Sequence, residues 1–222
     1  MTRLRLVAST ATGPNLAELG PVAPERLPPG RHGLPAHLVR THQRQRLLEA
    51  AATALSEQGY GRLTAARVTE LAGVSSRTFY QHFEDLWACL LAAYETEAAL
   101  LCAHLENACG AFPEGDRPAR ARAGIGAAID FLANEPAVAR LLSAEPPPQV
   151  TALAAARRDL AKRLGTRLRA VLEPGGATPL PGLERRLIGA AMALVAARAA
   201  SGDPQRLREL EPELSELLLA SL

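Results

Sequence analysis

Hydrogen-bonding side chains are concentrated in one short segment of the sequence. Seven of the eight residues from Ser75 to His82 carry a hydroxyl, guanidinium, amide or imidazole group, whereas most of the chain is rich in alanine, leucine and arginine. Such groups can donate hydrogen bonds to phosphate oxygens and to the edges of bases. The segment is therefore the first candidate for a polar contact surface. Its polar members are Ser75, Ser76, Arg77, Thr78, Tyr80, Gln81 and His82.

The residues around this segment predict two short helices joined by a tight turn. Thr64 is a good N-cap for a helix over 65–72, and Gly73 permits a sharp turn after it. Ser75 or the serine after it would cap a second helix that ends at His82. Two short helices with a glycine turn, the second one polar, form the layout of a helix-turn-helix, whose second helix enters the major groove of DNA.

Two aromatic residues separate the inner face of the predicted second helix from its outer face. Phe79 and Phe83 are four positions apart, so both should face the core of the head. The polar side chains between them would then face outward.

The remainder of the chain predicts an all-α protein. Hydrophobic residues make up 48% of the 222 residues and aromatic residues only 4%, so the core must consist mainly of Ala, Leu and Val. No segment alternates as a β-strand would. The expected architecture is a three-helix head over 40–83, a long connecting helix and a helical body. Further helices are expected at 118–133, 136–144, up to 173, 183–200 and 204–220.

Charge is distributed unevenly along the chain. The first 80 residues contain 10 Arg and 5 Glu, and the rest contains 15 Arg and Lys against 18 Asp and Glu. A basic first third followed by a mildly acidic remainder suits a DNA-contacting end, although a chance scatter of surface charge is the alternative. The three cysteines are an odd number in a chain of this size, so a disulfide framework is not expected. Without a signal peptide or a long apolar run, a cytoplasmic protein is expected.

The residues around the predicted turn resemble a known family. The segment EAAATALSEQGYGRLTAARVTELAGVSSRTFYQHFEDLWACLLAAYE is similar to the DNA-binding domain of TetR-type transcriptional regulators. The resemblance covers roughly 41–101 and implies a helix-turn-helix domain (41–101, motif 64–83) followed by a helical ligand-binding and dimerisation domain (102–222). Prolines and glycines without a helical period predict a flexible Pro/Gly-rich arm at 1–39.

The resemblance also implies roles for single residues. Ser76, Arg77 and Thr78 would meet base edges, and Thr64, Tyr80 and His82 would hold phosphates. Alternatives remain: Thr64 and Ser75 could serve only as helix caps, and Arg77 could simply be solvated. Tyr80 and His82 could only pack at the edge of the head. The full predicted DNA-binding set is Thr64, Ser75, Ser76, Arg77, Thr78, Tyr80, Gln81 and His82.

One position departs from the family pattern. The family usually carries a lysine directly after the Asp or Asn that begins the fourth helix, where it grips a phosphate. This chain has Leu86 there, after Glu84 and Asp85. We expect weaker salt-dependent DNA binding than in a relative that has the lysine.

A dimer and an effector are the partners that the resemblance implies. Small residues on one side of the predicted helix 183–200 would let a second copy approach closely, unless both of its faces are buried within one subunit. The predicted interface is Leu187, Gly189, Ala190, Ala193, Leu194 and Ala197. A small-molecule effector would bind in the body. The predicted pocket residues, for which plain core is the alternative, are Phe112, Phe131, Leu132, Leu141 and Met192.

The expected function is a dimeric repressor that a small-molecule effector releases from its DNA operator. The alternative is a TetR-like helical dimer that has weakened DNA binding and acts through protein contacts. No catalytic motif, such as G-x-S-x-G, a P-loop, a dinucleotide fingerprint or H-E-x-x-H, occurs in the sequence, so an enzyme is not expected. No cofactor and no metal site are expected either.

Overall fold

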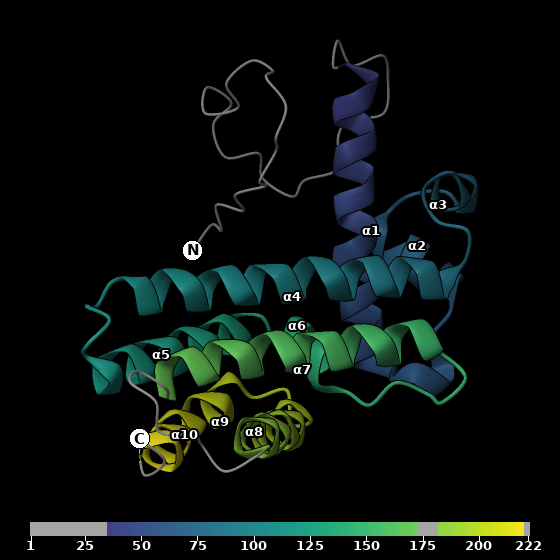
Figure 1. Ribbon diagram of the computed structural model, residues 1–222. Coiled ribbons are helices and arrows are strands. Elements are labelled where there is room, and N and C mark those ends of the chain that lie inside the picture. The colour runs from purple at the N-terminus through teal and green to yellow at the C-terminus, as the bar shows by residue number, and fades with distance from the viewer. Residues whose placement is uncertain (1–34, 173–181, 220–222) are drawn as a thin grey trace.

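The computed structural model describes residues 35–172 and 182–219, and the regular structure in these ranges is helical (Figure 1). The all-α prediction is confirmed. The helices are α1 (Ala36–Gln58), the 3₁₀ turn η2 (Tyr60–Arg62), α2 (Ala65–Ala72), α3 (Ser76–His82), α4 (Leu86–Gly110), α5 (Arg117–Asn134), α6 (Pro136–Ser143), α7 (Thr151–Leu172), α8 (Leu183–Ala199), α9 (Pro204–Arg208) and α10 (Leu210–Leu219).

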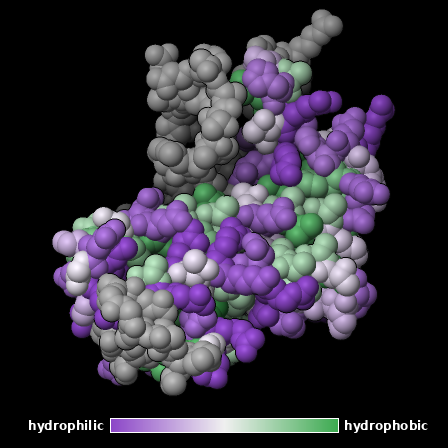
Figure 2. Space-filling view, in the orientation of Figure 1, coloured by the Kyte–Doolittle hydropathy of each residue, from purple (hydrophilic) through white to green (hydrophobic). Residues whose placement is uncertain are grey.

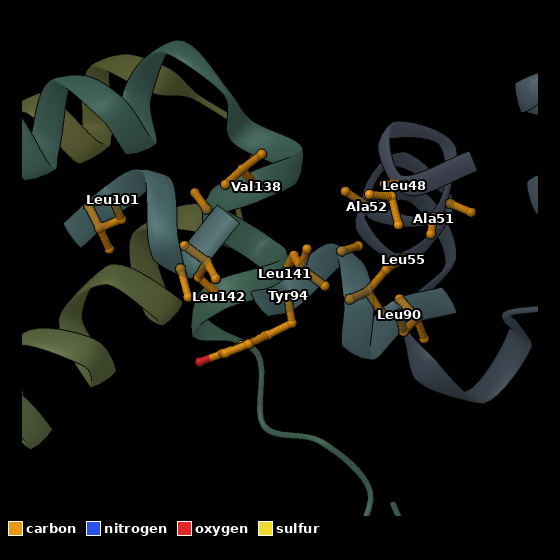
Figure 3. Close-up of a cluster of buried hydrophobic side chains, with 14 of the residues drawn as sticks. Leu48, Ala51, Ala52, Leu55, Leu90, Tyr94, Leu101, Val138, Leu141 and Leu142 are labelled. Atoms are coloured by element: carbon orange, nitrogen blue, oxygen red, sulfur yellow. The ribbon is translucent and has the colours of Figure 1, made fainter. Parts of the chain in front are cut away.

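The head is built on the second half of α1. Leu47, Leu48, Ala51 and Leu55 of that helix are buried, and they face α4 and α6 as well as α2. Figure 3 shows the side chains of Leu48, Ala52 and Leu55 directed toward Leu90 and Tyr94 of α4 and Leu141 of α6. One continuous core therefore joins the head to the body.

Helix α4 runs through the middle of the molecule and packs against α1, α5 and α7. Its N-cap is Asp85, whose Oδ1 accepts a hydrogen bond from the backbone N–H of Ala88 at 2.7 Å. Its side chains Leu90, Tyr94 and Leu101 are buried. By length and composition alone α4 could cross a membrane. Here its apolar side chains fill the core between the neighbouring helices.

Two boundaries differ from the sequence-based prediction. Helix α1 begins at Ala36 rather than Arg40, so the last residues of the predicted arm are helical. The first 34 residues of that arm lie outside the described residues. The predicted helix 204–220 is divided into α9 and α10, with Glu209 between them. Pro212 explains the break, because it lacks the N–H that would donate to the carbonyl of Arg208 in a continuous helix.

Candidate nucleic-acid interface and effector cavity

Local caps set the angle between α2 and α3. The hydroxyl of Thr64 accepts a hydrogen bond from the backbone N–H of Arg67 at 3.2 Å and so begins α2. Gly73 ends α2 in the left-handed region, at φ 60° and ψ 39°, which a residue with a Cβ rarely adopts. Ser75 then caps α3 by accepting from the N–H of Thr78 at 3.1 Å. These three positions turn the chain in the way that the sequence predicted.

Helix α3 has one buried and one open face. Phe79 is fully buried and Phe83 nearly so, which confirms the predicted inward aromatic pair, and their ring centroids lie 5.9 Å apart. The adjacent Tyr80 is 61% exposed. Of the other predicted DNA contacts, Thr64, Ser75, Ser76, Arg77 and Gln81 are exposed, and Thr78 and His82 are half-buried. All eight predicted side chains therefore keep access to solvent.

Two of these hydroxyls are engaged with each other. The Oγ of Ser75 and the Oγ1 of Thr78 lie 2.9 Å apart, within hydrogen-bond distance. Ser75 also accepts from the backbone, as described above. This arrangement fixes the first turn of α3, and one proton of the hydroxyl pair stays available to an outside acceptor.

Arg67 links α2 to the end of α1, a role that the sequence pattern did not indicate. Its guanidinium donates to Glu57 at the end of α1 and to Glu70 one turn along α2, both at 2.9 Å. The pairs are exposed to solvent, which screens them, so each contributes little to stability. Their main consequence is orientation, because they hold α2 against α1. An arginine with an acidic residue three positions later is the only local signal for this contact.

A basic cleft lies between the first turns of α1 and the end of α3, and sequence reasoning also missed it. Its volume is about 210 Å³, and it is lined by Arg40, Thr41, Arg44, Gln81 and His82. The guanidinium carbon of Arg44 lies 5.0 Å from the centroid of the Phe83 ring, in cation–π geometry. Figure 2 shows hydrophilic residues around α3, and hydrophilic residues beside hydrophobic ones over the outward end of α1.

Electrostatics in this cleft favour an anion. Burial, followed by the positive charges of Arg44 and Arg40, lowers the pKa of His82 below its usual value of 6.5. Among the described residues, no carboxylate lines the cleft, and neither arginine has an ion-pair partner.

Leu86 occupies the first position of α4, directly after the capping residue Asp85. Its side chain is half-buried and packs against the hydrophobic core. At this place the helix offers backbone N–H groups and the positive end of its dipole, but the side chain adds no charge. The chain therefore has no cation where the resemblance would place one.

The substitution Leu86→Lys should make DNA binding more dependent on salt. An added phosphate contact changes the slope of log K against log salt by about 0.9 per subunit. Fluorescence anisotropy with labelled duplex at several salt concentrations measures this slope. Leu86→Met, which preserves the packing without adding charge, is the control. A lysine variant with the slope of the methionine variant contradicts the prediction.

An apolar cavity of about 160 Å³ lies in the body among α4, α5, α6, α7, α8 and α10. Among the described residues, Ser143 is the one polar residue of the lining, and its hydroxyl donates to the carbonyl of Ala139 at 2.6 Å. A ligand in the cavity would therefore meet almost only hydrocarbon. The lining residues are Leu101, Leu105, Ile125, Ala128, Ile129, Leu132, Leu142, Ser143, Leu160, Leu164, Ile188, Ala191, Met192, Val195 and Leu214.

The predicted pocket residues are only partly brought together. Leu132 and Met192 line the cavity. Phe131 and Leu141 are buried but lie outside its lining, and the ring of Phe131 is instead 5.0 Å from that of His104. Phe112 is 40% exposed beyond the end of α4, so it does not belong to the lining. The cavity arises where distant helices meet, which a local sequence pattern does not indicate.

The predicted dimer residues occupy the outer face of α8. Gly189, Ala190, Ala193 and Ala197 are exposed, and a Cβ added at Gly189 would meet no atom within 4 Å. The remaining two predicted residues, Leu187 and Leu194, are half-buried beside them. Small side chains on an open helix face leave room for another backbone to approach closely.

The cysteines have the properties of packed thiols. Cys89 is fully buried, and burial raises the pKa of its thiol to about 12. Burial likewise raises the pKa of Cys102 and of Cys109. A thiol of raised pKa is a poor nucleophile, so these groups do not suit redox chemistry. Among the described residues, no three His, Cys, Asp or Glu side chains gather as metal ligands would.

Comparisons with known proteins agree with this geometry. Residues 47–93 match the family model described as bacterial regulatory proteins, tetR family. Comparison with curated proteins gives no match. Among solved structures, the fatty acid degradation regulator FadR from Bacillus halodurans superposes with a TM-score of 0.71 at 16% identity, over 81% of this chain and 96% of that one.

Two further solved structures have the same fold. FadR from Bacillus subtilis, in complex with stearoyl-CoA, gives a TM-score of 0.66 at 16% identity and covers 80% of this chain and 98% of its own. The regulator PfmR from Thermus thermophilus gives 0.59 at 20% identity, over 81% and 96%. At these identities the likeness establishes the fold. All three neighbours are described as regulators, two of them as transcriptional regulators.

Proposed function

We propose that this chain, whose residues 47–93 carry the DNA-binding head of the tetR family and whose fold is that of TetR-type transcriptional regulators, is a dimeric repressor released from its operator by a small-molecule effector. The observation that carries the proposal is the division of α3 into two faces. Buried Phe79 anchors the helix, and its polar outer face is open to solvent. A major groove admits one such helix.

Two heads are needed because one recognition helix contacts only a short stretch of DNA. One short helix reads few base pairs, so two heads related by a two-fold axis would read two half-sites. The exposed small-residue face of α8 supports a dimer through this helix. Operator binding would place the protein with the DNA in the cytoplasm.

The effector proposed for the cavity has an apolar chain. The lining is hydrocarbon except for Ser143, whose hydroxyl proton is already donated within α6. A similar fold, FadR from Bacillus subtilis, is in complex with stearoyl-CoA. An acyl chain is therefore the first ligand class to test here.

Helix α4 would connect the effector to DNA. Leu101 and Leu105 of α4 line the cavity. Nearer its start, Cys89 of the same helix is buried with its sulfur 3.8 Å from the carbonyl of Leu47 in α1. A ligand that prefers one position of α4 therefore biases one position of the head, which is sufficient for coupling.

Selection of bound duplexes from a random pool tests this function. The protein should enrich a sequence with two-fold symmetry, and long-chain acyl-CoA should reduce its recovery. Recovery of no sequence above background would contradict operator binding and would favour the alternative of a dimer acting through protein contacts. Enrichment that acyl-CoA leaves unchanged would reject the effector class while leaving the DNA-binding function in place.

A further inference from the structure

We infer that the basic cleft between α1 and α3, the cleft lined by Arg40, Thr41, Arg44, Gln81 and His82, binds a phosphate of the DNA backbone. This inference rests on the proposed DNA-binding function. It assigns a DNA-contacting role to the first turns of α1, which the helix-turn-helix motif at 64–83 does not include.

Positively charged and hydrogen-bond-donating side chains converge on the cleft from both helices. Arg40 and Arg44 are one turn apart on α1, so both side chains reach the same side of that helix. Across the cleft, Gln81 and His82 are the last two residues of α3. Two guanidinium groups, an amide and an imidazole thus converge from two elements. Donors of these kinds suit a phosphate oxygen, and arginine can bond it with two N–H groups.

Two of the cleft side chains are held in place by contacts within the protein. The ring of Phe83 lies under the guanidinium of Arg44 at 5.0 Å, which restricts that side chain without neutralising its charge. The hydroxyl of Thr41 donates to the carbonyl of His37 at 3.0 Å, so its oxygen is fixed at the wall. Arg44 and Thr41 therefore lose less side-chain entropy when an anion binds than unrestrained side chains would.

Size and position are compatible with a backbone phosphate. The cleft volume of about 210 Å³ is several times the roughly 30 Å³ that a water molecule occupies in the liquid. The cleft lies at the C-terminal end of α3. If α3 lies in the major groove, its end reaches the edge of the groove, where the sugar-phosphate strand passes.

This cleft also accounts for phosphate binding at a head whose α4 begins with Leu86 rather than a cation. In that arrangement the charge that grips the backbone comes from α1. The half-buried Leu86 is then free to pack against the core.

The test is the salt dependence of DNA binding by a double variant, Arg40→Gln with Arg44→Gln. Anisotropy with a fluorescent duplex of random sequence between about 50 and 200 mM NaCl gives the slope. Loss of one phosphate contact per subunit should make the slope shallower by about 0.9 per subunit. Over this salt range, the fold-loss of affinity of a dimeric variant should therefore be about twelvefold smaller than that of the unchanged dimer.

Two matched variants separate phosphate binding from other effects. Arg122→Gln with Arg158→Gln removes the same net charge from exposed positions on α5 and α7, and it should keep the original slope. Arg40→Lys with Arg44→Lys keeps the charge and should restore most of the slope. If the slope of the lysine variant is as shallow as that of the glutamine variant, the reduced slope results from the lost packing of Arg44 on Phe83. That result would overturn the inference.

The remaining outcomes distinguish the inference from the proposed function. If the unchanged protein binds duplex and the glutamine variant retains its slope, the inference fails while DNA binding stands. If the unchanged protein binds no duplex at any salt concentration, both fail together.

Discussion

Replacing Phe79 by alanine is expected to unfold the helix-turn-helix head, with a loss of about 3–5 kcal/mol in the free energy of unfolding. Phe79 is fully buried, and it is the side chain that attaches α3 to the core beside Phe83. A helix of seven residues has no stability of its own in water, so α3 depends on this anchor. Urea unfolding followed by circular dichroism measures the loss, and DNA binding should disappear with it.

Tyr80→Ala is the matched control, because it removes a neighbouring aromatic ring from the solvent-exposed face of the same helix. Tyr80 is 61% exposed, and its ring contacts Phe79 edge-on with centroids 5.2 Å apart. We expect a stability change of about 1 kcal/mol or less. Affinity for duplex should still fall about tenfold through a lost phosphate contact. Equal unfolding free energies for the two variants would contradict the assignment of faces on α3.

Replacing Ala193 by arginine is expected to separate the proposed dimer. Ala193 lies in the middle of the exposed small-residue face of α8. An arginine there would hold the second helix away and would have to bury its charge without a partner. Because one head binds far more weakly than two linked heads, operator affinity should fall by about 100-fold or more. Light scattering at micromolar concentration reports the mass directly.

Ala155→Arg provides the comparison for this variant. Ala155 is equally small and exposed but lies on α7 and is not among the predicted interface residues. It should keep the mass and the operator affinity of the unchanged protein. A monomeric unchanged protein, or an Ala193→Arg variant that retains the dimer mass, rules out the α8 interface.

Most of the head could be predicted from sequence because its signals are local. The N-cap at Thr64, the glycine turn at Gly73 and the four-residue spacing of Phe79 and Phe83 each act over a single turn. All three have the predicted outcome. Body helices were likewise found from their apolar periodicity, with boundaries within a few residues.

The remaining features depend on contacts between distant segments. The first turns of α1 have no apolar stripe, because their side chains face solvent and the cleft, so the helix was predicted to begin four residues late. The cavity unites side chains from six helices, and only Leu132 and Met192 of the five predicted residues line it. Arg67 reaches Glu57 as well as Glu70 because the fold brings the end of α1 beside α2, and the local sequence does not show this arrangement.

The cavity contacts α4 far from the start of that helix, so a small tilt at the cavity displaces the start by a larger distance. Leu101 lies 15 residues beyond Leu86, so the segment from the cavity to the start of the helix is a rigid arm of about 22 Å. A tilt of about 10° with its pivot at Leu101 would carry the far end of this lever by about 4 Å. In a two-fold dimer the two displacements add, against a half-site separation of about 34 Å. A ligand that displaces a few leucines would thus change the separation of the two heads, so that they no longer match the helical repeat of DNA, without unfolding either head.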